Sequence, residues 1–392
     1  MAGIATGYAP VSQMSRLSLI AGYADSLITF RGSLMAALAK SGVSVTATAP
    51  DIDAAMGARL RSLRVLPVSL SMQRTGMNPL QDIAYAARLY RLLRKLDTEI
   101  ILAYTIKPVI YGTLAAWLGR VPRRYALVTG LGYAFTGDRK GMVQRIVSLL
   151  YRFALARAHK VFFQNPDDER LFRQLGILPA AVPSVIVNGS GVDVGDYAFK
   201  PIANGAPVFL MIGRLLGDKG VREFAAAARS IKASVPFAKF QLVGWIDGNP
   251  DAIAQAELNA WIAEGTLEFL GKLDDVRPAI ADSTVYVLPS YREGTPRTVL
   301  EAMAMGRPII TTDAPGCRET VIDGENGFLV PVKSVDALVG AMLKFIEDPA
   351  LAPRMGKRSR EIAEEKYDVH KVNAVMLREM GIIPGGEENT HA

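Results

Sequence analysis

The chain is nearly without cysteine, because Cys317 is the only one in 392 residues. A single thiol can form neither an internal disulfide nor a metal cage of several cysteines. The composition therefore excludes disulfide-stabilised folds and cysteine-based zinc domains, and it is consistent with a reducing compartment.

Histidine is also scarce, with only His159, His370 and His391 in the sequence. None of the three lies near an expected strand end that would face a cleft between domains. The sequence thus argues against an enzyme that uses a histidine side chain as its general base.

Long unbroken apolar runs are missing as well. Lys107 and Pro108 interrupt one of the two most apolar segments, and Arg152 and Arg157 interrupt the other. A membrane-spanning helix needs about 20 consecutive apolar residues. The N-terminus also lacks the basic, apolar and small-residue regions of a signal peptide. We expect a cytoplasmic protein whose membrane contact is at most peripheral.

Length and charge divide the chain in two. A chain of 392 residues is longer than one hydrophobic core usually supports, so two domains are expected. Residues 1–200 contain 24 Lys and Arg against 12 Asp and Glu, whereas residues 201–392 contain 21 against 26, so the net charge of +7 is +12 combined with −5. Positive charge suits nucleic acid, an anionic membrane or an acidic substrate. Without aromatic stacking platforms or a zinc framework, nucleic acid is not expected.

Short apolar runs alternate with helical patterns along the whole chain, which indicates an α/β fold with parallel sheets. The expected strands are 17–21, 43–49, 64–69, 100–103, 125–129, 161–164, 185–187, 208–212, 239–243, 267–270, 285–288, 308–312 and 327–330. The prediction is two doubly wound domains. We expect them at 1–200 and 206–368 with a hinge at 196–207, and a last helix at about 369–384 that can pack back onto the first domain.

The segment 290–303 carries the most chemical information. It follows the expected strand 285–288 and leads into a helix, with Thr295 suited to the N-cap and Pro296 to the first helical position. The start of such a helix favours a phosphate, to which Thr298 could add a hydroxyl. Glu293 before the helix and Glu301 within it can serve two different sets of hydroxyls. Any one of these features also fits an ordinary capped helix.

The combination resembles the donor-binding half of glycosyltransferase family four. The residues that carry this resemblance are GTPRTVLEAMAMG at 294–306, PGCRE at 315–319 and DGENGFLV at 323–330. The match covers nearly all of residues 206–368. Members of this family are retaining enzymes with the GT-B fold, so the resemblance implies two Rossmann-like domains with a cleft between them.

The resemblance also implies roles for individual residues. Arg214 and Lys219, in the basic loop 213–220, would neutralise the diphosphate of a nucleotide sugar and stabilise the charge that develops when it departs. Glu293 would bind the donor sugar and would be catalytic together with these two cations, and Glu301 would bind the ribose. The other expected nucleotide-binding residues are Gly213, Gly294, Thr295, Arg297 and Thr298, with Lys272 and Leu273 framing the base. A basic loop can also be only a solvated surface.

No metal or cofactor is expected beyond the nucleotide-sugar co-substrate. No Asp-x-Asp pair lies at a strand end in a context suited to a divalent metal, and Asp51 and Asp53 look like the cap of a helix. Lys, Arg and a helix dipole can replace the metal, so the expected transfer is metal-independent.

The first half resembles the family less sharply. Its first loop, 22–32, has no Gly-Gly pair, and TGLGY at 129–133 has no histidine where many members place one. The absence of a base suits a reaction in which a donor phosphate oxygen takes the acceptor's proton.

The motifs FRG at 30–32, TIKP at 105–108 and TGLG at 129–132 are closest to a subgroup that extends undecaprenyl-diphosphate-linked oligosaccharides and is N-acetylgalactosaminyltransferase-like. The acceptor candidates are Arg31, Lys107, Gly130 and Gly132, with the two cations facing the acceptor's diphosphate. Helix-end or surface charges are the alternative for those cations.

Two basic amphipathic helices are expected in the first half, at 85–96 and 142–155. Their basic residues are Arg88, Arg91, Arg94 and Lys95 for the first, and Arg139, Lys140, Arg145, Arg152, Arg157 and Lys160 for the second. Such helices can sit at an anionic lipid surface, on the inner face of the plasma membrane. They can equally pack on the sheet with a solvated basic face.

The expected function is that of a hexosyltransferase in polysaccharide or glycan biosynthesis. It would transfer a UDP-linked hexose or N-acetylhexosamine to a lipid-linked or oligosaccharide acceptor. Two alternatives stay open, a GT-B enzyme of the nucleotide-sugar epimerase type and a two-lobed sugar-binding protein without catalysis.

Overall fold

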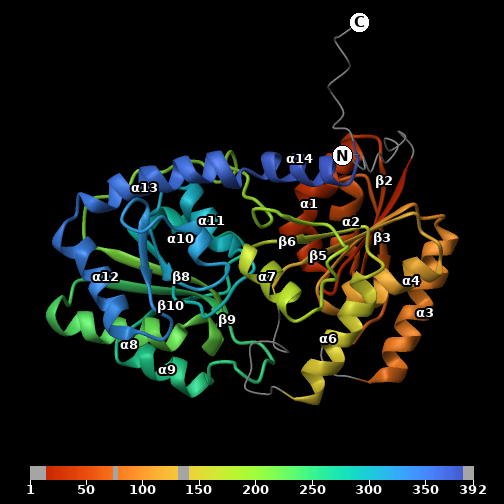
Figure 1. Cartoon of the computed structure of the whole chain (residues 1–392). Coiled ribbons are helices and arrows are strands. Elements are labelled where there is room, and N and C mark those ends of the chain that lie inside the picture. The colour runs from red at the N-terminus through yellow and green to blue at the C-terminus, as the bar shows by residue number, and fades with distance from the viewer. Residues whose placement is uncertain (1–14, 74–77, 131–140, 383–392) are drawn as a thin grey trace, which may run out of the picture. The chain divides into compact units, whose positions relative to one another are not determined.

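The computed structural model describes residues 15–73, 78–130 and 141–382 (Figure 1). The chain forms two compact units. Unit 1 contains Met1–Ser190 and His370–Ala392, and unit 2 contains Gly191–Val369.

Unit 1 is built on a parallel sheet of seven strands in the order β3-β2-β1-β4-β5-β6-β7. The strands are β1 (Arg16–Ile20), β2 (Ser44–Ala49), β3 (Val65–Ser69), β4 (Ile100–Tyr104), β5 (Arg123–Val128), β6 (Lys160–Phe163) and β7 (Ser184–Ile186). Their side chains alternate between two cores. In β6, for example, Phe162 enters one core and Phe163 the other. A strand that is apolar on both faces must be covered by helices on both sides.

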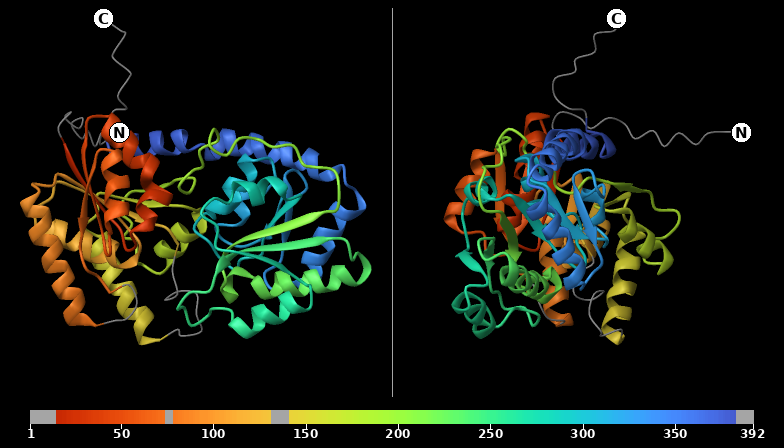
Figure 2. Two further views of the ribbon diagram at one scale, coloured as in Figure 1. Left: turned by 180° about the vertical axis from the view of Figure 1, so that it is seen from behind. Right: turned by 90° about the vertical axis from the view of Figure 1, so that its left-hand side faces the viewer.

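Helices cover both faces of this sheet. One core receives α1 (Asp25–Lys40), α2 (Ala54–Ser62) and α14 (Val369–Glu379). The other receives α3 (Pro79–Lys95), the π-helix η1 (Pro108–Gly112), α4 (Thr113–Leu118), α6 (Met142–Leu155) and α7 (Pro166–Gln174). Figure 2 shows the helices flanking the strands from two further directions.

Side-chain caps fix the starts of three of these helices. The Asp53 carboxylate accepts a hydrogen bond from the Met56 N–H at 2.7 Å, which confirms the expected cap of α2. Asn78 caps α3 and Asn165 caps α7, each followed by a proline at the first helical position.

Unit 2 contains a parallel sheet of six strands in the order β10-β9-β8-β11-β12-β13. The strands are β8 (Val208–Arg214), β9 (Lys239–Trp245), β10 (Glu268–Gly271), β11 (Val285–Leu288), β12 (Ile309–Thr312) and β13 (Gly327–Val330). The helices are α8 (Val221–Ser234), α9 (Gln255–Ala263), α10 (Arg277–Asp282), α11 (Arg297–Ala304), α12 (Val335–Glu347) and α13 (Leu351–Ile362), with the short helices η2 (Gly217–Lys219), η3 (Arg318–Thr320) and η4 (Ala363–Tyr367). Within this unit α8 packs against α12, and α11 packs against α13.

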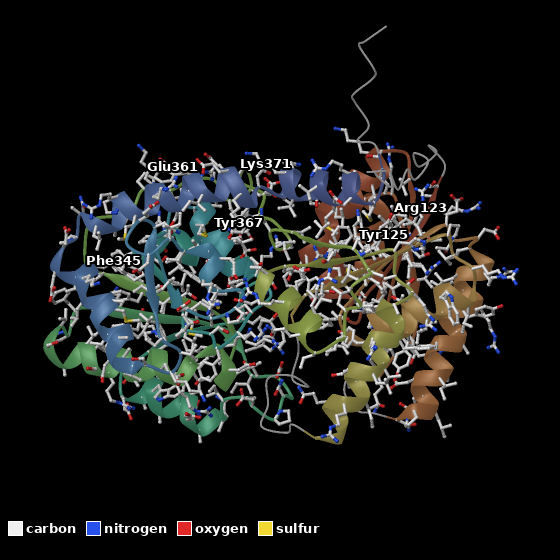
Figure 3. The ribbon with its side chains drawn as sticks, in the orientation of Figure 1. Arg123, Tyr125, Phe345, Glu361, Tyr367 and Lys371 are labelled. Carbon is white, nitrogen blue, oxygen red and sulfur yellow. The ribbon has the colours of Figure 1, made fainter. Side chains whose placement is uncertain are left out.

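All thirteen expected strands are present in the described residues, and their ends differ from the prediction by at most two positions. The prediction of two doubly wound α/β domains is confirmed. Aromatic residues such as Phe345, which packs edge-on against Phe328 at 5.5 Å, fill the core of unit 2 (Figure 3).

The expected domain boundary near residue 200 is wrong by about ten residues, because unit 2 begins at Gly191. The Val192 N–H donates to the Tyr367 carbonyl, and Val192 is fully buried in the core of unit 2. The Arg360 guanidinium then donates to the carbonyls of Val194 and Tyr197. Segment 191–200 is therefore bound along unit 2.

The C-terminal helix α14 belongs to unit 1. Met376 and Leu377 are buried in the core beside α1, and the Tyr125 hydroxyl donates to the Met380 carbonyl at 3.1 Å. Lys160 at the start of β6 forms an ion pair with Glu379 at 2.8 Å. The chain thus passes from unit 2 back to unit 1 between Val369 and His370.

Candidate active site

The winding of the unit 2 sheet reverses between its central strands β8 and β11. In open parallel sheets, ligands bind at the carboxyl ends of the strands where the strand order reverses. The loop after β8 carries Lys219 and the loop after β11 carries Glu293. The two loops that the sequence analysis singled out therefore meet at the expected edge of the sheet.

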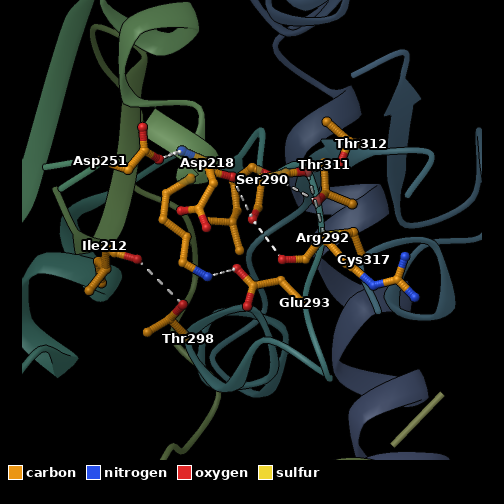
Figure 4. A network of polar contacts seen from close by, with 12 residues as sticks. Ile212, Asp218, Asp251, Ser290, Arg292, Glu293, Thr298, Thr311, Thr312 and Cys317 are labelled. Atoms are coloured by element: carbon orange, nitrogen blue, oxygen red, sulfur yellow. Dashed lines mark hydrogen bonds and ion pairs between the residues drawn. The ribbon is translucent and has the colours of Figure 1, made fainter. Parts of the chain in front are cut away.

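Hydrogen bonds join these two loops (Figure 4). The Asp218 carbonyl accepts from the Tyr291 N–H at 2.8 Å and from the Ser290 hydroxyl at 3.2 Å. Ser290 is completely buried. Asp218 directly precedes Lys219, and Ser290 lies three residues before Glu293, so these bonds hold together the two loops that carry the functional side chains.

Two glycines allow the close approach of the backbone around this site. Gly220 has φ +75°, and a Cβ there would lie 2.2 Å from the Pro289 carbonyl oxygen. Gly316 has φ +81°, and a Cβ there would lie 2.1 Å from the Glu293 carbonyl oxygen. Both positions require glycine because of their conformation and because of this contact.

The Lys219 ammonium forms an ion pair with the Glu293 carboxylate, with 2.5 Å between Nζ and Oε1 (Figure 4). The two side chains are only 17% and 15% exposed. Removing such groups from water costs free energy that their mutual attraction offsets. The pair thus holds a cation and an anion ready at the edge of the sheet.

Arg214, the last residue of β8, pairs with Asp247 in the loop after β9 at 2.9 Å. That loop is braced against the loop of Lys219, because Asp251 accepts a hydrogen bond from the Asp218 N–H at 2.7 Å. Burial raises the pKa of the Asp218 carboxyl above its usual range. The cations at 214 and 219 are therefore each compensated by a carboxylate.

Helix α11 begins one residue later than expected, so the prediction of Thr295 as N-cap and Pro296 as first helical residue is wrong. Pro296 is extended, with ψ 110°, and its carbonyl accepts from the Val299 N–H at 3.1 Å. Proline has no side-chain acceptor, so α11 starts without a side-chain cap.

Glu301 lies in the second turn of α11 and is 5% exposed. Its Oε1 accepts from the Arg297 guanidinium at 2.8 Å and from the Tyr197 hydroxyl at 3.0 Å. Burial raises the pKa of Tyr197 above its usual range. Two donors thus fix the orientation of the carboxylate that the resemblance assigns to ribose.

The remaining expected nucleotide-binding residues lie near the end of β8 or around the start of α11. The Thr298 hydroxyl is engaged by the Tyr286 hydroxyl at 2.7 Å, so its role toward a phosphate stays a prediction. A Cβ at Gly213 would meet no described atom within 4 Å, so there is open space on that side of its Cα. Gly294 is buried and Thr295 half-buried in the loop before α11.

The expected base-framing residues follow β10. Leu273 is half-buried and packs on the core of unit 2, whereas Lys272 is exposed. The Lys272 ammonium lies 5.2 Å from the ring centroid of Trp245, the last residue of β9. Sequence reasoning missed Trp245, Asp247 and Tyr197, because none lies in a motif that carried the resemblance.

Cys317 follows Gly316, the glycine that packs against the Glu293 carbonyl. It is completely buried, and burial raises the pKa of its thiol to about 12. Its Sγ contacts the Ser290 carbonyl at 3.9 Å (Figure 4). A thiol of this kind is not a nucleophile near neutral pH.

The acceptor candidates of unit 1 lie in different environments. Arg31 is 2% exposed on α1 and lies over the Tyr104 ring at 5.4 Å, so it is not a surface charge. Lys107 pairs with Asp82 at 2.7 Å, and the Tyr111 hydroxyl donates to the same carboxylate. Gly130 follows β5, and Gly132 lies outside the described residues.

The described residues offer no metal cluster, and their two histidines lie away from the carboxyl ends of the strands. In residues 15–73, 78–130 and 141–382, no group of three or more His, Cys, Asp or Glu side chains could hold a metal ion. His159 precedes β6, at the amino end of the strand, and accepts from the Arg124 N–H at 3.1 Å. Burial and the neighbouring arginines lower its pKa. His370 is exposed on α14, and His391 lies outside the described residues.

Two family models match the chain. Residues 206–348 match "Glycosyl transferases group 1", and residues 28–189 match "Glycosyl transferase 4-like domain". The first match contains the strands β8 to β13 and the ion pairs Lys219–Glu293 and Arg214–Asp247, and the second lies within unit 1.

Curated relatives are of similar length. The N,N'-diacetylbacillosaminyl-diphospho-undecaprenol alpha-1,3-N-acetylgalactosaminyltransferase of Campylobacter jejuni is 29% identical over 79% of this chain and 84% of its own. The UDP-Gal:alpha-D-GlcNAc-diphosphoundecaprenol alpha-1,3-galactosyltransferase of Escherichia coli is 29% identical over 69% of this chain and 72% of its own.

Solved structures share the fold. Sucrose-phosphate synthase from Thermosynechococcus elongatus has a TM-score of 0.76 at 21% identity, covering 93% of this chain and 98% of its own. HepE of Anabaena, crystallised with UDP, has a TM-score of 0.73 at 20% identity, covering 94% and 100%. The fold is therefore GT-B. The chain belongs to the glycosyltransferases, with a group 1 domain that contains the paired cations and carboxylates and a 4-like domain.

Proposed function

We propose that the enzyme transfers a UDP-linked hexose or N-acetylhexosamine, with retention, to an undecaprenyl-diphosphate-type glycolipid or an oligosaccharide. The names of the Campylobacter and Escherichia relatives support this choice, because both describe transfer to a sugar on diphospho-undecaprenol. The product would serve polysaccharide or glycan biosynthesis.

The observation that carries the proposal is the Lys219–Glu293 ion pair at the reversal of the unit 2 sheet. A bound diphosphate would lie against Lys219 and Arg214, which then exchange their carboxylate partners for phosphate oxygens. Glu293, released from Lys219, would accept hydrogen bonds from the hydroxyls of the donor sugar. Glu301 would accept from the ribose hydroxyls with its orientation already fixed by Tyr197 and Arg297.

Fixed cations stabilise the transition state of this transfer. The bond between the anomeric carbon and the diphosphate oxygen breaks, and its electron pair stays on the diphosphate. The acceptor oxygen bonds to the anomeric carbon from the same face, and its proton passes to an oxygen of the leaving diphosphate. Arg214 and Lys219 stabilise the developing negative charge. This route needs no protein base.

The reaction we propose is also metal-independent. Two cations at the diphosphate can stabilise its negative charge, as a divalent metal does in metal-dependent enzymes. Activity should therefore be retained in EDTA. Loss of activity in EDTA that manganese restores would overturn this part of the proposal.

Unit 1 would bind the acceptor through Arg31, Lys107 and the turn at Gly130. The Lys107 side chain is 14% exposed and its ammonium is paired with Asp82, so an acceptor diphosphate would compete with Asp82 for this cation. Arg31 is held near the carboxyl end of β4 by the ring of Tyr104.

An anionic membrane surface, on the inner face of the plasma membrane, is the further partner we propose for unit 1. Helices α4 and α6 expose a set of apolar side chains: Trp117, Leu118, Ile146, Leu149 and Phe153. We call this set the α4–α6 surface. The Trp117 ring on α4 and the Phe153 ring on α6 meet edge-on at 6.3 Å, and the Arg157 guanidinium lies over both. Arg145 and Arg152 are exposed on the same helix α6, as expected of a helix at an anionic interface.

Two of the expected basic residues do not support this surface. Lys160 is paired with Glu379, and Arg88 donates to the Ser71 carbonyl at 2.9 Å. Arg139 and Lys140 lie outside the described residues. In the described part of the chain, no helix is long and apolar enough to cross a membrane.

The test is incubation of the protein with labelled UDP-hexoses and UDP-N-acetylhexosamines and an undecaprenyl-diphosphate-linked sugar. Labelled glycolipid with the donor's anomeric configuration is the expected product. An epimerised nucleotide sugar, or an unchanged donor with every acceptor, would contradict the proposal. A thermal-shift screen of donors identifies the sugar, because a tightly bound ligand raises the melting temperature.

A further inference from the structure

Trp245 is an exposed aromatic residue at the carboxyl edge of the unit 2 sheet, beside the proposed donor site. It ends β9 and is 40% exposed, whereas Trp261 on α9 is 6% exposed. An isolated exposed apolar side chain is common and needs no explanation. Trp245 is distinguished by its position among charged groups, of which Arg214 is proposed to bind the diphosphate.

The sheet register places Trp245 next to Arg214. The two residues are direct partners in the parallel pairing of β8 and β9, and such partners project from the same face of a sheet. The Trp245 carbonyl accepts a hydrogen bond from the Leu215 N–H at 3.0 Å, which fixes the backbone of Trp245. Two residues further on, Asp247 pairs with Arg214. The indole therefore stands beside the cation proposed for the diphosphate.

The other neighbour of the indole is Lys272, whose ammonium lies 5.2 Å from the ring centroid. Lys272 follows β10, the strand next to β9. A cation over an aromatic face is attracted by the electron density of the ring. Arg214, Trp245 and Lys272 thus form a row across three adjacent strand ends.

We propose that Trp245 is the platform on which the nucleobase of the donor stacks, with Lys272 donating a hydrogen bond to a carbonyl oxygen of the base. This inference rests on the proposed function and adds the base-binding residue to it. Neighbouring strands are about 4.8 Å apart, so the row extends away from Arg214 by the width of two strands. A nucleotide whose diphosphate lies at Arg214 would place its base, beyond the ribose, over β9 and β10.

Tryptophan fluorescence tests the proposal, because the chain has only Trp117, Trp245 and Trp261. UDP and uridine should quench the emission of the native protein and of the Trp117→Phe variant, when the indole is excited at the red edge of its band. The Trp245→Phe variant should show no such quenching. Ribose 5-phosphate, which has no base, should quench none of them.

Affinity gives an independent measurement. Trp245→Ala should weaken the binding of UDP and of uridine alike by about tenfold, in line with the stacking of a base on an aromatic ring, whereas Trp245→Phe retains most of it. Trp261→Phe is the control for a substitution in the same unit. The melting temperature of each unliganded variant shows whether it folds.

The outcomes separate this inference from the function on which it rests. If native protein binds UDP but Trp245→Ala binds it equally well, Trp245 is not the base platform and the proposed donor site stands. Quenching that persists in Trp245→Phe leads to the same conclusion. If native protein binds no UDP by fluorescence or calorimetry, both the inference and the UDP donor are wrong.

Discussion

Each cation proposed to contact the diphosphate forms an ion pair with a carboxylate in this structure, Lys219 with Glu293 and Arg214 with Asp247. The two pairs differ in exposure. Lys219 and Glu293 are mostly buried, so removing one leaves a charge with little water around it. Arg214 is 41% exposed, so its pair with Asp247 contributes little to stability, about 0–1 kcal/mol. Arg214 can therefore exchange Asp247 for a phosphate at low cost.

Arg214→Ala should weaken UDP binding about tenfold or more while leaving uridine binding unchanged. A hydrogen bond between charged groups contributes about 1.5–3 kcal/mol, and only the diphosphate would lose it. Isothermal titration calorimetry with both ligands measures the difference.

Asp247→Asn is the matched variant, because it keeps Arg214 and removes only its resting partner. Its UDP affinity should stay within about fivefold of native, the range that an exposed ion pair allows. Equal UDP affinity in Arg214→Ala and native protein would contradict the placement of the diphosphate.

The sequence identified the residues of the site through their motifs and missed their partners. Lys219, Glu293 and Glu301 lie in segments that carry the family resemblance. Asp247 and Tyr197 do not, and they reach the site only because β9 pairs with β8 and because segment 191–200 runs along unit 2. Such contacts depend on tertiary structure and leave no local pattern.

At the scale of elements, strands were predictable and some junctions were not. Runs such as 285–288 are apolar at every position because both faces of the sheet are covered, and that signal is local. The start of α11 was misplaced because Pro296 takes an extended conformation that its residue type alone does not decide. The unit boundary was misplaced because the prolines near 201 and 207 mark a loop, not the place where the packing changes.

The turn at Gly316 positions the loop of Glu293, and Gly316→Ala tests it. The alanine would have to adopt the left-handed backbone conformation of Gly316, which costs about 1–2 kcal/mol of stability. Its methyl group would also lie against the Glu293 carbonyl oxygen. We expect a lower melting temperature and a loss of transfer activity greater than the loss of folded protein.

Gly324→Ala is the control, because Gly324 has a similar φ of +79° and a Cβ there would meet no described atom within 4 Å. This variant should lose only the stability that the left-handed backbone conformation costs an alanine, and it should keep its activity. If both variants behave alike in thermal unfolding and in the transfer assay, the contact with the Glu293 loop does not matter.

At the scale of the whole molecule, charge is distributed unevenly. Residues 1–200 carry an excess of 12 positive charges, whereas residues 201–392 carry an excess of 5 negative ones. Exposed apolar residues of the α4–α6 surface occur in the basic part. Apolar and basic side chains on one surface are the combination that binds an anionic bilayer.

Flotation with vesicles tests this surface. Each basic residue near an anionic surface contributes about 1 kcal/mol, so reversing Arg145 and Arg152 to Glu should weaken binding by roughly two orders of magnitude. Reversing Arg222 and Arg229, both on α8 in unit 2, makes the same change of charge and should weaken it little. Equal flotation of the two double variants, or no binding of native protein at low salt, would refute the proposal.

The rate of sugar transfer by Glu293→Gln tests the central claim most directly, that the ion pair at the reversal of the unit 2 sheet is the catalytic donor site. The substitution keeps the shape of the side chain and removes its charge. Glu264→Gln is the control, because Glu264 forms a surface ion pair with Arg229 in the same unit. We expect a fall of about a hundredfold or more for Glu293→Gln and little change for the control. A folded Glu293→Gln protein that transfers sugar at the native rate would contradict the account.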